Sequence, residues 1–382
     1  MASGSLTIVQ MLPELEAGGV ERGTLETGAY LVGQGHRSIV ISGGGRLVPQ
    51  LVEAGTEHVE MRVGDKNPSL LKYLAPVRSL LLKENVDVLH LRSRVPAWVG
   101  YLAAKSIPKA KRPVIITTFH GFYSVHFFSG IMARGERVIA ISNFIADHIK
   151  ENYGTDPSKI RVIHRGFDPD YFNPEAVSRD RVDALKKSWG LDKSHAPVIM
   201  LPARITGWKG HKLFIEALSL VRDQDFVAVC VGDVEDNPEY SKTLFDEVKE
   251  RGLEGRVLFP GHCSDMPAAL MNADMAVSAS LEPEAFGRVA VEAQAMGLPV
   301  VATAHGGSLE TVLPGETGWL VSHESPAQMA QALKEALADP DLRRKMGARA
   351  KSWVWENFTA TKMCSRTLEV YHELLKEKGR GL

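Results

Sequence analysis

The sequence is poor in the features that mark secreted, nucleic-acid-binding and membrane-spanning proteins. Its 382 residues include three cysteines, Cys230, Cys263 and Cys364, which lack metal-ligand spacing and fit a reducing compartment. Lys and Arg total 45 and Asp and Glu total 46, so the net charge gives no argument for a nucleic-acid partner. No apolar run approaches a bilayer span, and no signal-peptide pattern precedes the first strand-like run. We expect a cytoplasmic protein.

The sequence also lacks a G-x-G-x-x-G motif after its first strand-like run. Gly18 and Gly19 stand there instead, and no acidic ribose partner stands out about 20 residues later, which disfavours a nicotinamide site. Paired glycines at a helix start still let the backbone approach a ligand and offer N–H donors to it. The alternative is a plain tight turn.

Strand-like apolar runs alternate with helical segments along most of the chain. The runs cover residues 6–11, 37–42, 86–91, 114–119, 137–142 and 160–163, then 198–201, 226–231, 257–259, 275–280 and 300–303. This alternation predicts an α/β protein with mostly parallel sheets, and the length suits two doubly wound domains. The turn-rich stretch 166–174 marks the approach to the domain boundary, and residues 352–376 are predicted to form an amphipathic helix.

Two carboxylates flank a Phe-Gly turn between a predicted strand and a predicted helix. Glu284 lies on the loop, and Glu292 lies one turn into the helix on the same side as Arg288. The free N–H groups of the helix N-terminus between them can bind phosphate. One carboxylate can then bind sugar hydroxyls on one side of that phosphate, and the other carboxylate can bind hydroxyls on the far side. This arrangement is that of a nucleotide-sugar site. The alternative is two unrelated surface carboxylates.

Two cations lie on the loop after the predicted strand 198–201. Arg204 and Lys209 flank a glycine-containing segment at the position where open α/β sheets bind ligands. Such a pair can converge on a diphosphate, with the Arg side chain as a fork and the Lys side chain as a point charge. Taken alone, the pair is also compatible with an ordinary surface loop.

Together these motifs resemble the retaining glycosyltransferases of glycosyltransferase family 4. Glu284-x-Phe286-Gly287-x4-Glu292 matches the family's E-x-F-G-x4-E signature, and Arg204 and Lys209 match its donor-phosphate pair. The resemblance implies the GT-B fold, two Rossmann-like domains facing a cleft, with the C-terminal helix crossing back to the first domain. It implies an acceptor-binding domain over 1–178, a nucleotide-sugar-binding domain over 179–360 and the returning helix over 361–382. Trp353, Trp355 and Phe358 suit that crossing or, equally, the core of the second domain.

The resemblance also implies roles for individual donor-site residues. Arg204 and Lys209 would neutralise the leaving diphosphate, Glu284 would bind sugar hydroxyls and Glu292 the ribose hydroxyls. The remaining donor-binding positions are Gly18, Gly19, Phe286, Gly287, Arg288, Gly232, Asp265 and Met266. Arg288 departs from the family, which commonly has an apolar residue there, so donor geometry could differ. The bound base, uridine or guanosine, stays open.

We expect no cofactor and no metal requirement, because the two cations and a helix N-terminus suffice to neutralise the leaving group. The donor would be a UDP- or GDP-sugar carrying a hexose-type sugar. The acceptor would be a hydroxyl of a glycan or glycolipid. Family resemblance implies a front-face mechanism in which the leaving phosphate deprotonates that hydroxyl, rather than a double displacement by a carboxylate.

Acceptor-side predictions concern the ends of two strands in the first half. His120 is predicted as a catalytic residue that orients the acceptor hydroxyl or donates a hydrogen bond to the sugar. Gly121 and His90 are weaker acceptor-binding candidates, and a packed structural histidine is the favoured alternative for His90.

The loop 121–130 holds four aromatic residues that either pack inward or form an apolar lip for a lipid-linked acceptor. A basic cluster just upstream, residues 105–112, could meet anionic lipid head groups at the cytoplasmic face of the inner membrane, and a solvated loop is the alternative. The overall pattern, including Lys66-Asn67-Pro68, resembles bacterial envelope enzymes, particularly those of the lipopolysaccharide core.

Three other classes remain as alternatives. A GT-B-fold UDP-N-acetylglucosamine epimerase would share the domains, but the two-Glu signature argues against it. A non-catalytic sugar-nucleotide-binding module would keep Arg204 and Lys209 without turnover. A Rossmann oxidoreductase is opposed by the missing fingerprint.

Overall fold

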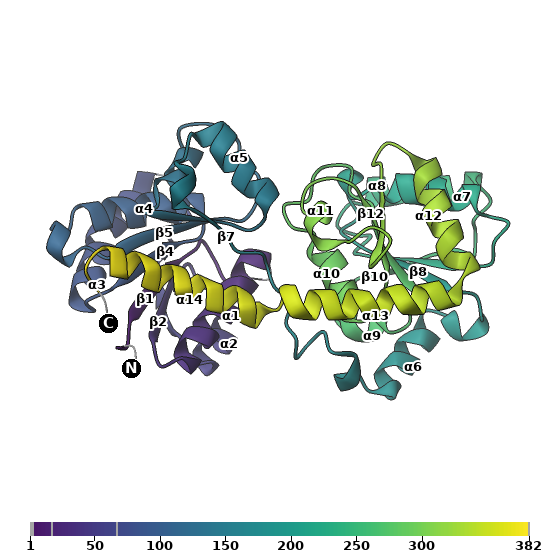
Figure 1. Cartoon of the computed structure of the whole chain (residues 1–382), viewed down its shortest axis with the longest axis horizontal. Helices are drawn as coiled ribbons and strands as arrows, with labels where there is room; N and C mark the ends of the chain where they lie inside the picture. Colours follow the sequence, from purple (N-terminus) through teal and green to yellow (C-terminus); the bar gives the residue numbers. More distant parts are fainter. Residues whose placement is uncertain (1–3, 17, 66–67, 381–382) are drawn as a thin grey trace. The chain divides into compact units, whose positions relative to one another are not determined.

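The computed structural model describes residues 4–16, 18–65 and 68–380, so Lys66 and Asn67 lie outside the described residues. The chain forms two compact units (Figure 1). One comprises Met1–Arg165 with Ala360–Leu382, and the other comprises Gly166–Thr359. The first unit ends at Arg165 rather than at the predicted 178, because the segment that follows packs inside the second unit. There the Phe167 amide donates to the Phe358 carbonyl at 2.8 Å, and the Phe167 ring meets Trp355 edge-on.

The first unit is built on a seven-stranded parallel sheet with the strand order β3-β2-β1-β4-β5-β6-β7. This order reverses direction between β1 and β4, as in doubly wound folds. The strands are β1 Thr7–Met11, β2 Arg37–Ser42, β3 Glu57–Glu60, β4 Val88–Leu91, β5 Val114–Phe119, β6 Arg137–Ala140 and β7 Ile160–Val162.

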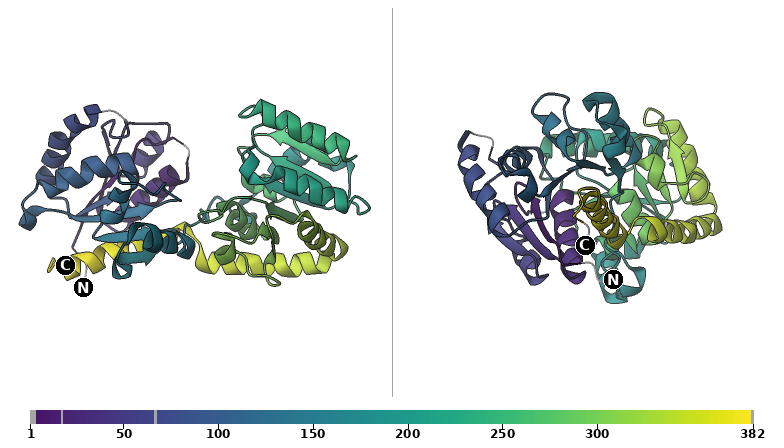
Figure 2. Two further views of the ribbon diagram at one scale, coloured as in Figure 1. Left: turned by 90° about the horizontal axis from the view of Figure 1, so that it is seen from above. Right: turned by 60° about the vertical axis from the view of Figure 1, so that its left-hand side comes forward.

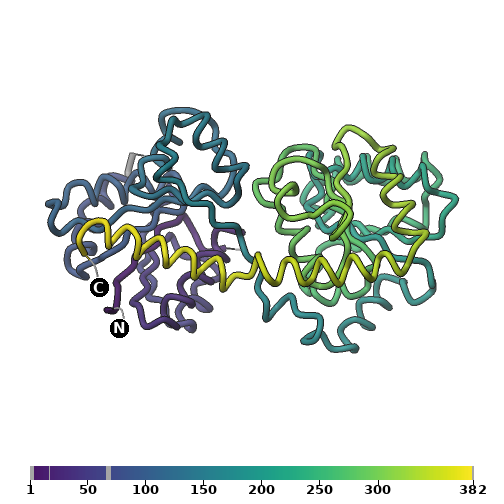
Figure 3. The backbone as a smooth tube through the Cα atoms, in the orientation of Figure 1, coloured from purple at the N-terminus to yellow at the C-terminus, as the bar shows by residue number. Residues whose placement is uncertain are grey.

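Helices lie on both faces of this sheet (Figure 2). They are α1 Gly19–Gly33, α2 Val48–Glu53, α3 Leu74–Lys83, α4 Arg94–Lys105, α5 Asn143–Tyr153 and α14 Ala360–Glu377, with 3-10 turns η1 Pro68–Tyr73, η2 Lys109–Lys111, η3 Ser129–Arg134 and η4 Pro157–Lys159. The α14 helix, near the C-terminal end of the chain, lies beside α1, near its N-terminal end (Figure 3). The first unit therefore contains both the N-terminal and the C-terminal segments. The buried face of α14, which includes Met363, Tyr371 and Leu374, shares one core with strand residues Ile8 and Ile116. The predicted return of the C-terminal helix to the first domain is confirmed.

The second unit repeats the architecture with a six-stranded parallel sheet in the order β10-β9-β8-β11-β12-β13. Its direction reverses between β8 and β11. The strands are β8 Val198–Pro202, β9 Val227–Val231, β10 Val257–Gly261, β11 Met275–Ser278, β12 Val300–Thr303 and β13 Gly318–Val321. The helices are α6 Arg179–Ser188, α7 His211–Leu220, α8 Pro238–Glu250, α9 Met266–Leu270, α10 Arg288–Ala295, α11 Ser308–Thr311, α12 Pro326–Ala338 and α13 Pro340–Asn357, with η5 Pro174–Ala176, η6 Leu191–Lys193 and η7 Gly207–Lys209.

Several helices of this unit begin at the same local sequence signal, a polar cap followed by proline. Asn237, Ser325 and Asp339 each accept a hydrogen bond from a backbone N–H of the first turn, and each precedes a proline at the first helical position. The side chain satisfies an otherwise unpaired donor, and the proline ring is preset for helical φ.

The predicted two doubly wound sheets are confirmed, with two local corrections. Strands β3 and β13 were missed. The β3 sequence Glu-His-Val-Glu is an edge strand without a buried side chain, so it carries no apolar run. The predicted continuous helix 352–376 is two helices, because the Phe358 carbonyl leaves the helix to accept from Phe167. The Phe358 ring packs on Phe286 and Trp353, so these aromatics belong to the core of the second unit.

Buried thiols and helix composition agree with the sequence-level expectations. Burial raises the pKa of the Cys230 and Cys364 thiols to about 12, which keeps both protonated. Within the described residues, no helix is both long enough and apolar enough to cross a bilayer.

Candidate active site

Arg204, Lys209 and Glu284 lie on the loops that follow the adjacent strands β8 and β11. Parallel neighbouring strands bring their carboxyl ends to one edge of the sheet, here at the point where the strand order reverses. The two loops are tied by a backbone hydrogen bond of 2.7 Å from the Leu281 N–H to the Trp208 carbonyl. Gly210, with φ +73°, lets them touch, since a Cβ there would lie 1.8 Å from the Ala279 carbonyl oxygen.

Glu284 is held by side chains from both loops. Its Oε1 atom accepts from the Ser280 hydroxyl at 2.6 Å and forms an ion pair with the Lys209 ammonium group. The Lys209 and Glu284 side chains are only 13% and 17% exposed. A carboxylate fixed in this way has one oxygen committed to the protein and is suited to accept hydrogen bonds from a ligand with the other.

The predicted cations differ in their surroundings. Lys209 lies 4.0 Å from the ring centre of Trp208 and is paired with Glu284, whereas Arg204 is exposed and lies 6.0 Å from the same ring. Among the described residues no carboxylate forms an ion pair with Arg204. This loop therefore presents one uncompensated guanidinium group at the sheet edge, where an anionic ligand would be favoured.

The N-terminus of α10 carries the second predicted carboxylate. Gly287 caps the helix with φ +86°, a left-handed conformation that favours glycine. One turn on, Glu292 accepts from Arg288 at 2.6 Å, the i,i+4 pairing that the sequence predicts. This ion pair ties the Arg288 guanidinium group to the first turn of α10, where Glu292 compensates its charge.

Residues 305–307, just after β12, position Glu284. Gly306 and Gly307 pack against the backbone of the Glu284 loop. The Gly307 N–H donates to the Glu284 carbonyl at 2.8 Å, and a Cβ on Gly307 would lie 2.4 Å from Phe286. His305 bonds to the Ser280 carbonyl at 2.7 Å. Burial lowers the pKa of His305, so its imidazole is neutral at pH 7.

Three other residues predicted to bind the donor have structural roles in the second unit. Gly232 packs so tightly that a Cβ would lie 2.1 Å from the Ala203 carbonyl oxygen. Asp265 caps α9 by accepting from Ala268, and its two oxygens accept from Arg181 at 2.7 and 2.8 Å. The Arg181 hydrogen bonds hold the pKa of Asp265 below its usual value. Met266 is the first residue of α9. Gly232 follows β9, and Asp265 and Met266 lie after β10.

In the first unit, Gly18 and Gly19 form the start of α1 as predicted. Gly18 is the N-cap, and a Cβ on it would lie 2.3 Å from the Glu21 carboxylate. The Gly19 carbonyl accepts a hydrogen bond from the Arg165 guanidinium group. The turn also places an acidic group, Glu21, beside the helix N-terminus.

His120 lies directly after β5 next to two buried arginines. Both of its ring nitrogens are shielded from solvent and form no hydrogen bond with a described residue. Burial, followed by the charges of Arg165 and Arg92, holds the pKa of His120 well below its usual value, so the imidazole is neutral at pH 7. A cavity of about 20 Å³ adjoins it, large enough for one water molecule. Arg92 and Arg165 were not predicted as site residues, although Arg92 directly follows β4 and Arg165 follows β7.

His90 and Gly121 differ from His120. The two ring nitrogens of His90 are 2.6 Å from the Tyr371 hydroxyl and 2.6 Å from the Thr118 hydroxyl, inside the protein. Both are thus committed, which agrees with the packed-histidine alternative. Gly121 is partly exposed, and nothing lies within 4 Å of a Cβ built on it. Within the described residues, no group of three or more His, Cys, Asp or Glu side chains is arranged as a metal site.

The chain matches known proteins over almost its whole length. Residues 17–171 match the model of Glycosyltransferase Family 4, and residues 183–353 match the model of Glycosyl transferases group 1. A crystal structure of a glycosyltransferase from Rickettsia africae is 37% identical, with a TM-score of 0.90 over 97% of this chain and 99% of that one. The N-acetyl-alpha-D-glucosaminyl L-malate synthase of Bacillus anthracis is 28% identical over 93% of this chain and 94% of that protein.

The structure of Anabaena HepE in complex with UDP-glucose is 22% identical, with a TM-score of 0.78 over 96% of this chain and 99% of that one, a likeness of fold. Two Rossmann-like units with charged loops at their sheet edges define an α/β enzyme of the GT-B class. Within that class, the chain belongs to the glycosyltransferases described by the Family 4 and group 1 models. It is a glycosyl-transferring enzyme.

Proposed function

We propose that this protein transfers a hexose-type sugar, with retention of anomeric configuration, from a nucleoside diphosphate donor to an acceptor hydroxyl. The observation that carries the proposal is the Lys209–Glu284 ion pair at the carboxyl edges of β8 and β11, beside the uncompensated Arg204. One cation is held against a carboxylate and the other is free, so a diphosphate and the hydroxyls of its sugar find complementary groups side by side.

The carboxylate contacts favour a front-face mechanism over a double displacement. Glu284 is bound by Lys209 and Ser280, which disperses its charge and makes it a weaker nucleophile. In the proposed reaction the leaving phosphate removes the proton of the acceptor hydroxyl while the glycosidic C–O bond breaks and a new one forms on the same face. Glu284 binds sugar hydroxyls, and Glu292 binds the ribose while it orients Arg288.

His120 fits the proposal as a neutral hydrogen-bonding group on the acceptor side. A neutral imidazole with two unpaired nitrogens can orient a hydroxyl and does not repel the adjacent guanidinium groups. The choice between a UDP-sugar and a GDP-sugar donor stays a prediction. So do the lipopolysaccharide core as acceptor and contact with a membrane surface. The Bacillus relative is named for transfer to L-malate, so small hydroxy acids belong among the acceptors to be tested.

A thermal-shift screen with UDP, GDP and ADP, followed by their sugar conjugates, tests donor binding. A ligand that binds only the folded state raises the melting temperature as its concentration rises. One nucleoside diphosphate should shift the transition, Lys209→Ala and Glu292→Ala should reduce the shift, and Lys212→Ala on exposed α7 surface is the matched control. The absence of any shift would contradict the proposed phosphate site.

Turnover is then followed by release of the nucleoside diphosphate, and the product anomer is assigned by NMR. Glu284→Ala should lower turnover more than it weakens binding of the free nucleotide. EDTA should leave the rate unchanged, and a strict divalent-ion requirement would overturn neutralisation by protein cations. A sugar isomer formed without acceptor would indicate the epimerase alternative, and donor binding without turnover on any acceptor would indicate the binding module.

A further inference from the structure

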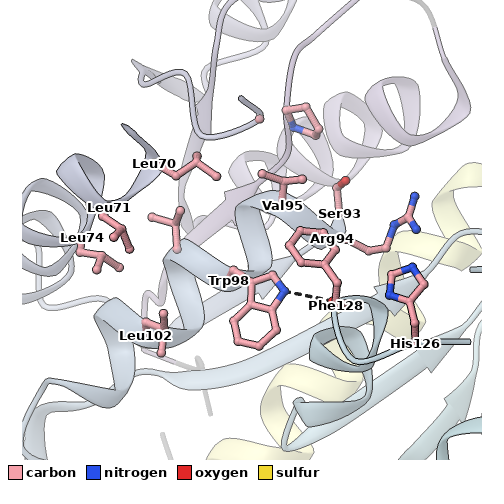
Figure 4. A pocket seen from close by; sticks show the side chains of 13 residues that line it. Leu70, Leu71, Leu74, Ser93, Arg94, Val95, Trp98, Leu102, His126 and Phe128 are labelled. Atoms are coloured by element: carbon pink, nitrogen blue, oxygen red, sulfur yellow. Dashed lines mark hydrogen bonds between the residues drawn. The ribbon is translucent and has the colours of Figure 1, made fainter. Parts of the chain in front are cut away.

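The first unit contains an apolar pocket that the donor-side chemistry does not use. It has a volume of about 890 Å³, within the range of small-molecule sites. It lies between η1 and α3 on one side and α4 on the other (Figure 4). Leucines from η1 and α3 face Trp98 and Leu102 of α4, while Arg94 and His126 lie at the opposite end. The pocket is therefore apolar along its length and polar at one end.

Large apolar side chains around this pocket are exposed to solvent. Leu71 is 64% exposed, Leu102 is 42% exposed and Phe127 is 76% exposed. The Phe127 ring packs at a tilt against Trp98, with 5.3 Å between the ring centres, and the Trp98 indole N–H donates to the Phe128 carbonyl at 3.0 Å. Isolated apolar residues on a surface need no explanation, but a group of them around a pocket marks a binding site for an apolar partner.

The charge at the polar end of the pocket is of one sign. Among the described residues, no aspartate or glutamate lines the pocket and none forms an ion pair with Arg94. Its guanidinium group lies over the Tyr123 ring at 4.8 Å and donates to the Ser129 hydroxyl at 3.2 Å. Arg94 is also the first residue of α4, where the helix dipole disfavours a cation. An anion at this end of the pocket would compensate both the Arg94 guanidinium charge and the positive end of the α4 helix dipole.

We propose that this pocket binds the hydrocarbon chain of an amphiphilic acceptor whose phosphate group lies at Arg94. This proposal rests on the proposed function, because it assigns the pocket to the acceptor of the same transfer reaction. The volume and the leucine and tryptophan lining suit the chain, and the uncompensated Arg94 suits the head group. The loop 121–130 forms part of the apolar lip of this site through Phe127 and Phe128.

The test is titration calorimetry of the full chain, without donor, with alkyl phosphates of six, eight and ten carbons kept below their micelle concentrations. Each methylene that enters the pocket should tighten the Kd by up to about fourfold. Alkyl glucosides of the same lengths, which lack the charge, should bind more weakly. A Kd that does not change with chain length would overturn the proposal.

Variants separate the chain site from the head-group site. Leu71→Asn or Leu102→Asn should weaken every alkyl phosphate about tenfold, and Val52→Asn, an exposed apolar position on α2 outside the pocket, should not. Arg94→Gln should remove the preference for phosphate over glucoside while the dependence on chain length stays. Equal affinities in Leu71→Asn and the wild-type protein would contradict the assignment. Unchanged melting temperatures establish that the variants fold.

Two other occupants give distinct results. Binding only above the micelle concentration, or only to vesicles, would indicate adsorption to a lipid surface and overturn the pocket site. Concentration-dependent dimerisation that Leu71→Asn abolishes in sedimentation velocity would assign the face to a second copy of this chain. Because these measurements contain no donor, alkyl phosphate binding can succeed while transfer fails, which would contradict the proposed function alone.

Discussion

Lys209 and Glu284 form an ion pair between the loops that follow β8 and β11, although they are far apart in the sequence. Both side chains are largely shielded from water, and Glu284 also accepts from Ser280. Each partner therefore fixes the other, and a change to one alters the position of both. This coupling has measurable consequences for binding and turnover.

A double-mutant cycle of Lys209→Ala and Glu284→Ala should give non-additive effects on kcat/KM. Either single change should lower kcat/KM about 100-fold, because each removes a group that binds the donor and releases its partner. The double variant should lose less than the product of the two, with a coupling of about 1–3 kcal/mol. Steady-state kinetics of the four proteins measures the coupling. Strict additivity would show that the ion pair plays no part in the active conformation.

Gly210→Ala should destabilise the second unit and disturb both loops. Gly210 has φ +73°, which costs an L-residue about 1–2 kcal/mol, and a Cβ there would also lie 1.8 Å from the Ala279 carbonyl oxygen. Gly207→Ala is the matched control in the same loop, because nothing lies within 4 Å of a Cβ at Gly207. Urea denaturation should give a lower midpoint for Gly210→Ala only. Equal midpoints would refute the close contact between the loops.

Tyr371→Phe should lower the free energy of unfolding of the first unit by about 1–3 kcal/mol. The change removes the 2.6 Å hydrogen bond to buried His90 and leaves one imidazole nitrogen unpaired. Tyr30→Phe is the control, since the Tyr30 hydroxyl forms no hydrogen bond with a described residue, although its ring packs near the same core. Thermal unfolding followed by circular dichroism compares the two. A neutral Tyr371→Phe would mean that the hydrogen bond between Tyr371 and His90 does not stabilise the first unit.

His211 should make the second unit less stable as the pH falls below about 6.5. Burial, followed by the charge of Lys209, lowers the pKa of His211 to about 4. Between these values the unfolded chain binds a proton that the folded chain does not, so stability is complete above about 6.5 and is lost toward pH 4. The loss is at most about 3 kcal/mol.

The variant His211→Leu isolates this contribution from those of the buried His90 and His120. Urea midpoints at pH 7.5, 6 and 4.5 should fall less steeply for the variant than for the wild-type protein. Parallel pH profiles for the two proteins would rule out a neutral, buried His211 in the folded state.

Local sequence signals predicted the elements well where those elements carry a strong pattern. Buried strands such as Val114–Phe119 and Val300–Thr303 are continuous apolar runs, and their predicted bounds are those of the structure. The edge strand Glu57–Glu60 has no such run and was missed. The break at Phe358 was missed because its cause, the hydrogen bond to Phe167, joins residues distant in sequence.

The sequence by itself determined the class of the protein, the parallel sheets and the strand-end positions of Arg204, Lys209, Glu284 and Glu292, because periodicity and loop chemistry are local. Only the tertiary structure decided which of these groups touch. It paired Lys209 with Glu284, left Arg204 uncompensated and enclosed the pocket beside Arg94. Such contacts depend on the order of strands in a sheet and on close backbone approach at residues such as Gly210, which no local pattern encodes.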